Sequence, residues 1–204
     1  MMSRFQNLYA RLAKFYDLFY APFLLRGIKM AMEELHLESG QHILEVGIGT
    51  GITLNMYPRD VQVIGIDLSQ EMLRVAQKKK KKLNLKNVTL KHMSADRLEF
   101  ADHSFDRVFA PSVMSVVSDP YKVMNEMIRV CKPGGLISIV SHFAGEDLAS
   151  QVLDKFFEPI TRHYFGFHMT TSRHLYTQQK GVEILSIKKT IKPNFSDVIL
   201  LKKN

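Results

Sequence analysis

The most informative part of this 204-residue chain is His42-Ile43-Leu44-Glu45-Val46-Gly47-Ile48-Gly49-Thr50-Gly51, where an apolar run leads into three closely spaced glycines. Such a run is typical of a buried parallel strand that ends in a tight loop. Glycines remove the β-carbons where the backbone bends sharply and where a ligand can lie against it. A second apolar run, Val61–Asp67, ends in an acid about 20 residues after the first glycine, the usual distance from a dinucleotide-type loop to its ribose-binding carboxylate. The pattern predicts a nucleoside-containing cofactor; the alternative is a structural glycine turn in an unrelated α/β fold.

The order of the glycines and the acid before them distinguish between classes of cofactor. A dinucleotide loop reads G-x-G-x-x-G and directs backbone N–H groups at a pyrophosphate. Here the order is Gly-Ile-Gly-Thr-Gly, and Glu45 lies two residues before the first glycine. A carboxylate at that position would repel a pyrophosphate and attract a cationic ligand. The E-V-G-x-G-x-G pattern with its acid-terminated second strand resembles the class I S-adenosylmethionine-dependent methyltransferases, whose cofactor carries a sulfonium and an ammonium group and no phosphate.

Length and composition are those of one soluble globular domain. The chain is 46% hydrophobic and 24% charged, which is ordinary for such a domain. No apolar run approaches the ~18 residues that span a bilayer, and the N-terminus lacks a signal-peptide pattern, so we expect no transmembrane segment. The single Cys131 excludes an internal disulfide, consistent with a reducing cytoplasm, and the scattered histidines predict no metal site.

The formal net charge of +8 favours an anionic partner. Nucleic acid, an anionic membrane surface or an acidic substrate would each fit. Much of the excess lies in Lys78–Lys82, which is also explained as the solvated end of a surface helix. No aromatic residues interleave with this run, so we expect no specific nucleic-acid partner.

Apolar periodicity alternates between helix and strand from residue 29 onward, which predicts an α/β fold with a mostly parallel sheet and helices on both faces. The predicted strands are 42–47, 61–67, 87–92, 105–110, 136–141, 182–191 and 195–202. The predicted helices are 28–37, 52–57, 70 into the lysine run with Ser69 as N-cap, 120–130, 148–157 and 172–180. The last two strands predict an antiparallel hairpin. The family resemblance implies a Rossmann-like seven-stranded methyltransferase sheet whose last strand is antiparallel.

We expect a single methyltransferase domain over residues 1–204 with three parts. Residues 1–25 form an N-terminal amphipathic helix or lid, 26–145 the cofactor-binding core, and 146–204 the substrate-side helices and terminal hairpin. Ligands of such sheets bind at the carboxyl ends of the strands, near the point where strand order reverses. The candidate site residues all follow predicted strand ends, so they converge on one edge.

The resemblance assigns S-adenosylmethionine as cofactor, with S-adenosylhomocysteine as product, and gives each candidate a role. Asp67 would accept hydrogen bonds from both ribose hydroxyls, because a carboxylate has two acceptor oxygens. Asp96 would bind the adenine amino group, with Leu68 or Met93 lining the ring; either acid is alternatively a helix N-cap or a surface residue. The predicted cofactor-binding residues are Glu45, Gly47, Gly49, Thr50, Gly51, Asp67, Leu68, Met72, Ala95, Asp96, Arg97 and Ser112.

The segment Arg129–Gly135 resembles the turn that precedes the fifth strand of these methyltransferases. Its proline and paired glycines predict a helix stop followed by a left-handed turn. Cys131 within it is interpreted as a buried apolar side chain rather than a nucleophile.

Two segments resemble bacterial phosphatidylethanolamine N-methyltransferases. They are Val113–Pro120, similar to an M-S-V-V-x-D-P segment of those enzymes, and Ser141-His142-Phe143, where those enzymes usually have Asn-His-Phe. The resemblance covers about residues 5–145 and implies methylation of phosphatidylethanolamine or a related lipid amine towards phosphatidylcholine. The alternatives are a methyltransferase for a small-molecule or quinone-precursor acceptor and a non-catalytic basic binding protein on the same fold.

The N-terminal segment independently suggests a lipid surface. Its apolar residues share one helical face, with Arg4, Arg11 and Lys14 off that face. The apolar positions are Phe5, Leu8, Leu12, Phe15 or Tyr16, and Phe19. This pattern is typical of an interfacial amphipathic helix, and equally of a lid packed on the cofactor pocket. We expect a cytoplasmic protein peripherally associated with the inner face of an anionic membrane; the sequence leaves the oligomeric state open.

The chemistry predicts a base and amine-orienting groups near the acceptor. An ammonium must lose a proton before its nitrogen can attack, and His142, just past the fifth strand, is the candidate base because its ordinary pKa is near 6.5. Tyr16 and Tyr20 are alternatives that could orient the amine through hydrogen bonds or ring faces. A structural histidine is the competing interpretation of His142.

Overall fold

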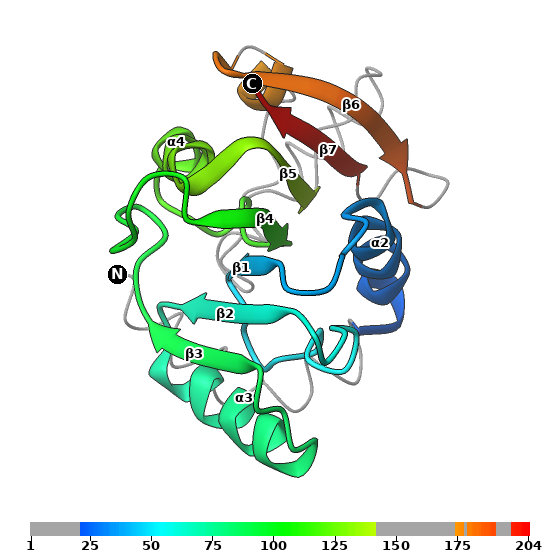
Figure 1. Ribbon diagram of the computed structural model, residues 1–204, viewed down its shortest axis with the longest axis vertical. Coiled ribbons are helices and arrows are strands. Elements are labelled where there is room, and N and C mark those ends of the chain that lie inside the picture. Colours follow the sequence, from blue (N-terminus) through cyan, green and yellow to red (C-terminus); the bar gives the residue numbers. More distant parts are fainter. Residues whose placement is uncertain (1–20, 142–173, 178, 191–196) are drawn as a thin grey trace, which may run out of the picture.

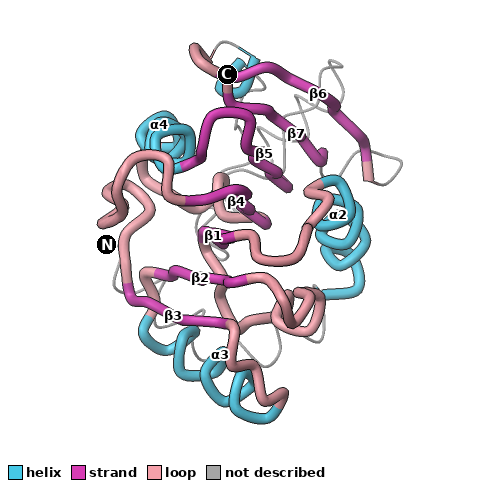
Figure 2. The backbone as a smooth tube through the Cα atoms, in the orientation of Figure 1, coloured by secondary structure: helices cyan, strands magenta, loops and turns pink. Residues whose placement is uncertain are grey.

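The computed structural model describes residues 21–141, 174–177, 179–190 and 197–204 (Figures 1 and 2). Within these residues lies a seven-stranded sheet of order β3-β2-β1-β4-β5-β7-β6, running from β3 at the bottom of Figure 1 to β6 at the top. The strands are β1 His42–Val46, β2 Gln62–Asp67, β3 Val88–His92, β4 Phe105–Pro111, β5 Cys131–Ser141, β6 Val182–Lys189 and β7 Asp197–Lys203.

Strand directions confirm the predicted doubly wound sheet. Strands β1 to β5 pair in parallel, whereas β7 is antiparallel to both β5 and β6. The chain leaves β1 towards β2 and β3 on one side and later returns to β4 and β5 on the other. The strand order therefore reverses at β1, and this reversal defines the edge at which α/β proteins bind ligands.

Helices cover both faces of the sheet, as predicted. They are α2 Ala21–Glu34, α3 Gln70–Lys82, α4 Pro120–Val130 and α6 His174–Thr177. Ile28 and Ala31 of α2, together with Leu35 directly after it, share one buried cluster with Leu73 and Ala76 of α3. The cluster on the other face contains Met124 and Met127 of α4 and Leu175 and Tyr176 of α6. Because both faces are covered, the central strands are almost wholly apolar.

Two helix starts follow the expected capping chemistry. Ser69 caps α3, its side chain accepting a hydrogen bond from the backbone N of Met72 at 3.3 Å, as predicted. Asp119 caps α4 in the same way through the backbone N of Lys122 at 3.0 Å, and Pro120 occupies the first turn. These caps fix where α3 and α4 leave the site-bearing edge.

The structure corrects four predictions of secondary structure. The helix expected over 28–37 is α2, which begins at Ala21 and ends at Glu34, and the helix expected over 172–180 is the short α6, His174–Thr177. Residues 52–56 form hydrogen-bonded turns and Tyr57 forms a bend, rather than a helix, and the side chains of Thr53 and Tyr57 point inward to Glu45. Strand β5 begins at Cys131 rather than 136, because Cys131 pairs with Phe105 before a register shift. Gly134 in this strand has the predicted left-handed φ of +75°. The predicted helix 148–157 and the N-terminal segment 1–20 lie outside the described residues.

No helix among the described residues combines the length and apolar character needed to cross a bilayer.

Candidate functional site

The glycine loop after β1 is held in a conformation that other residues rarely adopt. Gly47, Gly49 and Gly51 have φ of +76°, +55° and +72°. A Cβ at Gly47 would lie 2.6 Å from Cγ2 of Val113, and one at Gly51 would lie 2.4 Å from Cδ1 of Leu54. At Gly49, by contrast, no atom of the described residues lies within 4 Å of the Cβ position. The outer glycines therefore allow close packing, and no described residue packs against the Cβ position of the middle one.

Asp67 ties this loop to the end of β2. Its Oδ2 accepts a hydrogen bond from the backbone N of Gly49 at 2.8 Å, and its Oδ1 accepts one from the backbone N of Ser69 at 2.8 Å. Burial raises the pKa of the Asp67 carboxyl, whereas these two backbone donors lower it. Each carboxylate oxygen keeps acceptor capacity beyond the bond it makes. The carboxylate oxygens therefore keep lone pairs that a further donor could use.

Glu45 lies beneath the loop. The side chain is fully buried and accepts hydrogen bonds from the hydroxyl of Thr53, 2.8 Å from both carboxyl oxygens, and from the hydroxyl of Tyr57 at 2.6 Å. Burial raises the pKa of Glu45 to about 7, while the two hydroxyl donors lower it and the charge of Asp67 raises it further. Sequence reasoning singled out Glu45 and missed both of its partners.

The loops after β3 and β4 complete the same edge. Ser112 has φ of +59°, and its backbone N donates to the carbonyl O of Val140 at 2.7 Å. A left-handed non-glycine residue is uncommon and marks a locally constrained backbone. Asp96 accepts a hydrogen bond from the hydroxyl of Ser118 at 3.4 Å. The segment after β4 thus reaches both the loop after β3 and the end of β5.

Comparison with known proteins agrees with this geometry. A family model described as "Methyltransferase domain" matches residues 44–139, from β1 to β5. A phosphatidylethanolamine N-methyltransferase from Cereibacter sphaeroides is 47% identical over 106 residues, covering 52% of this chain and 52% of that protein.

Residues 44–139 match a methyltransferase domain and have the characters of the class I S-adenosylmethionine-dependent methyltransferases.

Two further likenesses concern the same domain. A demethylmenaquinone methyltransferase from Listeria welshimeri is 35% identical over 116 residues, covering 55% of this chain and 49% of that protein. The structure of a SAM-dependent methyltransferase from Methanosarcina mazei superposes with a TM-score of 0.67 at 24% identity, covering 84% of this chain and 96% of that one. The chain therefore spans about half the length of the two sequence relatives, and the solved structure supports the fold.

S-adenosylmethionine is the cofactor of this methyltransferase domain. The residues at the edge fit it. Among the described residues, no atom within 4 Å meets the Cβ position of Gly49, and the Asp67 carboxyl contacts its backbone N, while the Glu45 carboxyl is buried two residues before the loop. Carboxyls suit ribose hydroxyls and a cationic ligand, and they do not suit a phosphate.

The described part of the methyltransferase domain brings most of the predicted cofactor residues to this edge. Leu68 is 42% exposed, and Nε2 of His92 lies 2.9 Å from the carbonyl O of Leu68. Met72 is buried in the first turn of α3, and Thr50 is buried with its hydroxyl 3.4 Å from Nζ of Lys79. Ala95 and Arg97 lie in the loop after β3 with Asp96. His142, Tyr16 and Tyr20 fall outside the described residues, so their roles stay predictions.

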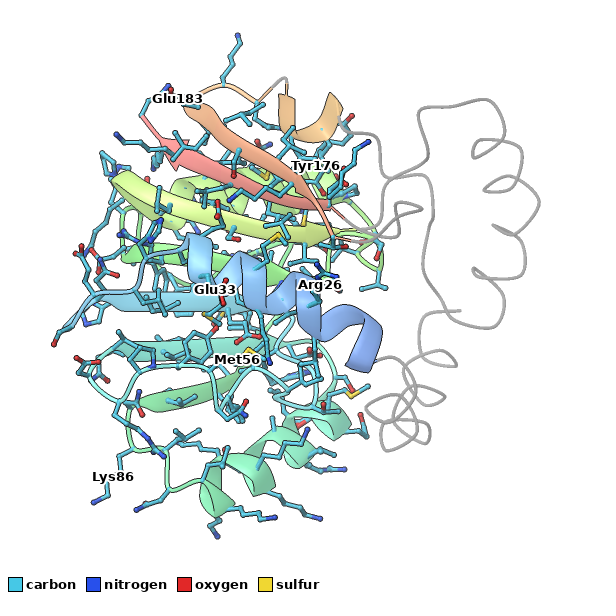
Figure 3. The ribbon with its side chains drawn as sticks, turned by 90° about the vertical axis from the view of Figure 1, so that its right-hand side faces the viewer. Arg26, Glu33, Met56, Lys86, Tyr176 and Glu183 are labelled. Atoms are coloured by element: carbon cyan, nitrogen blue, oxygen red, sulfur yellow. The ribbon has the colours of Figure 1, made fainter. Side chains whose placement is uncertain are left out.

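Two other predictions concern Cys131 and the lysine run. Cys131 is buried, and that burial raises the pKa of its thiol to about 11, which agrees with a packing role. The lysine run ends α3, as predicted for a solvated helix end, with Lys78, Lys81 and Lys82 exposed, and Nζ of Lys79 lies 3.4 Å from the Thr50 hydroxyl. Figure 3 shows Lys86, which follows this run, far from Tyr176 on the opposite side of the molecule.

The fit of Gly47 against Val113 can be measured with a matched pair of variants. Gly134 has nearly the same φ as Gly47, but no described atom lies within 4 Å of its Cβ position. We expect Gly134→Ala to lower the free energy of unfolding by about 1 kcal/mol through backbone strain. Gly47→Ala adds overlap with Val113 and lowers it by about 1–3 kcal/mol more. Urea denaturation followed by circular dichroism measures both; equal losses would contradict the contact with Val113.

Proposed function

We propose that this protein is an S-adenosylmethionine-dependent N-methyltransferase that acts on phosphatidylethanolamine or a related lipid amine. The observation that carries the proposal is the 47% identity to a protein named phosphatidylethanolamine N-methyltransferase. The segment Val113–Pro120, which resembles those enzymes in sequence, begins where Val113 packs against Gly47. An acceptor bound over this segment would therefore lie next to the cofactor loop.

In this proposal different residues of the edge bind different parts of the cofactor. Asp67 binds the ribose hydroxyls with the acceptor capacity left beyond Gly49 and Ser69. Asp96 binds the adenine amino group, and Leu68 and Met93 line the ring. The remaining predicted contacts are Glu45, Gly47, Gly49, Thr50, Gly51, Met72, Ala95, Arg97 and Ser112.

The bound cofactor supplies an activated methyl group on a sulfonium, so the protein's task is to position and desolvate the acceptor. His142 follows directly on Ser141, the last residue of β5, and removes a proton from the acceptor ammonium. Tyr16 and Tyr20 orient the amine. The N-terminal segment rests on the cytoplasmic face of an anionic membrane, where each basic residue contributes about 1 kcal/mol.

A second acceptor class has its own support. The Listeria welshimeri relative at 35% identity is named a demethylmenaquinone methyltransferase. A quinone-precursor enzyme would use the same cofactor edge and differ on the acceptor side.

Transfer of a radiolabelled methyl group from S-adenosylmethionine separates the two acceptors. With phosphatidylethanolamine vesicles we expect label in extracted phospholipid, and His142→Ala lowers the rate by about 100-fold or more because the base is lost. His42→Ala, an exposed histidine at the start of β1, is the matched control and retains the rate. Label that enters demethylmenaquinone and never enters lipid would contradict the lipid assignment.

The proposed role of Asp67 in cofactor binding is tested by measuring cofactor affinity alone. Asp67→Asn removes the negative acceptor, and we expect the Kd for S-adenosylmethionine to rise about 10- to 100-fold. Asp60→Asn changes an exposed acid and leaves the Kd unchanged. Isothermal titration calorimetry reports both values, and an unchanged Kd in Asp67→Asn would exclude Asp67 from the cofactor site.

Deletion of residues 1–20 distinguishes a membrane helix from a lid. We expect the shortened protein to lose co-sedimentation with anionic vesicles and to keep its affinity for S-adenosylmethionine, because the segment contacts lipid. Retained vesicle binding together with weakened cofactor binding would instead identify a lid.

A further inference from the structure

A closed cluster of polar side chains lies under the glycine loop, on the face of the sheet covered by α2 and α3. Glu45, Thr53 and Tyr57 are at most 4% exposed, and both hydroxyls donate to the Glu45 carboxyl. Burial and the neighbouring Glu45 hold the pKa of Tyr57 well above its ordinary value, so its hydroxyl keeps its proton. The hydroxyls of Thr53 and Tyr57 therefore stay protonated, and Glu45 is the group of this cluster that gains or loses a proton.

The surroundings of Glu45 oppose its charge. On the neighbouring strands it lies opposite Gly65 of β2 and Phe109 of β4, which offer it no charge. The carboxyl of Asp67, at the end of β2, acts on it with the same sign of charge. Removal from water and the like charge favour neutral Glu45, whereas the hydroxyls of Thr53 and Tyr57 favour the carboxylate. The balance between them places its pKa at about 7.

We propose that Thr53 and Tyr57 are positioning residues that act through Glu45, and that the charge they maintain there makes the site prefer the cationic methyl donor over its product. S-adenosylmethionine carries a sulfonium, an ammonium and a carboxylate, with one net positive charge. S-adenosylhomocysteine lacks the sulfonium charge and is neutral overall. A carboxylate under the loop attracts the first more than the second, so loss of the methyl group weakens binding and favours release of the product.

This selectivity depends on pH in a predictable direction. A carboxyl whose pKa is about 7 is ionised to about one-tenth at pH 6 and about nine-tenths at pH 8. The bound sulfonium stabilises the carboxylate, so binding of the donor near neutral pH expels a proton from Glu45, and binding of the product expels less. The preference for the donor rises through this range by up to about tenfold.

The first test uses the full chain and no acceptor, so its result is independent of the lipid proposal. Calorimetric titrations with S-adenosylmethionine and S-adenosylhomocysteine, at pH 6 to 8 and in buffers of different ionisation enthalpy, give both Kd values and the protons released. The same titrations of Glu45→Gln measure the protons exchanged by the ligands' own ammonium groups. This contribution is then subtracted from the wild-type values. Between pH 6 and pH 8 we expect the ratio of the product Kd to the donor Kd to rise about tenfold more in the wild type than in Glu45→Gln. A ratio that changes equally in the two proteins would overturn the proposal.

The second test addresses Tyr57. Tyr57→Phe keeps the ring and removes one donor, so the pKa of Glu45 rises and the midpoint of the pH dependence moves upward. At pH 7 we expect donor affinity to fall several-fold with little change in product affinity, and to recover at higher pH. Tyr121→Phe, an exposed tyrosine on α4, is the control and shifts nothing. Equal weakening of both ligands at every pH would show a purely structural role and contradict the proposal.

Infrared spectroscopy of the wild-type protein keeps the proposal testable if a buried variant does not fold. A protonated carboxyl has a carbonyl band that the carboxylate lacks. We expect this band at pH 6.5 to diminish on addition of S-adenosylmethionine more than on addition of S-adenosylhomocysteine. An unchanged band would overturn the proposal, as would a pH dependence abolished in Asp67→Asn and retained in Glu45→Gln.

Discussion

The carboxylate of Asp67 holds the site-bearing edge of the sheet together. By accepting from the backbone N of Gly49 and of Ser69, it joins the loop after β1 to the turn that starts α3. The loop can follow this path because Gly47 packs on Val113 without a side chain, and no other part of the described chain lies within 4 Å of the Cβ position of Gly49. These constraints shape the loop at which we propose that the cofactor binds, and the segment after β4 lies beside it at Val113.

Much of the fold could be predicted because central parallel strands are buried on both faces and are therefore apolar runs. The strands of the core, the cap at Ser69 and the antiparallel last strand agree with the structure. The prediction was wrong at 52–57, where apolar spacing suggested a helix but Thr53 and Tyr57 turn in to Glu45. The early start of β5 depends on pairing between Cys131 and Phe105, and one strand's sequence does not reveal its partner.

The same distinction between local signals and contacts made only on folding applies to the candidate site. Glycine spacing and strand-terminal acids are local signals, so Gly47, Gly49 and Asp67 were found from sequence. Contacts between Glu45 and residues 8 and 12 positions later require the folded loop, so Thr53 and Tyr57 were missed. The available signal was that Thr53 and Tyr57, four residues apart, both carry a hydroxyl group. The roles of His142, Tyr16 and Tyr20 stay predictions, because these residues lie outside the described structure.

In our proposal the cofactor and the acceptor use different parts of the chain: the cofactor uses the edge formed by β1, β2 and β4, and the acceptor uses the segment after β4 and the end of β5. The most direct measurement of the central claim is a crystal structure with S-adenosylhomocysteine bound. Our account predicts the ribose hydroxyls on the Asp67 carboxylate, the ligand backbone over Gly49, and the sulfur on the side of the loop above Glu45. A ligand that lies elsewhere, or whose ribose hydroxyls bind another group, would contradict it.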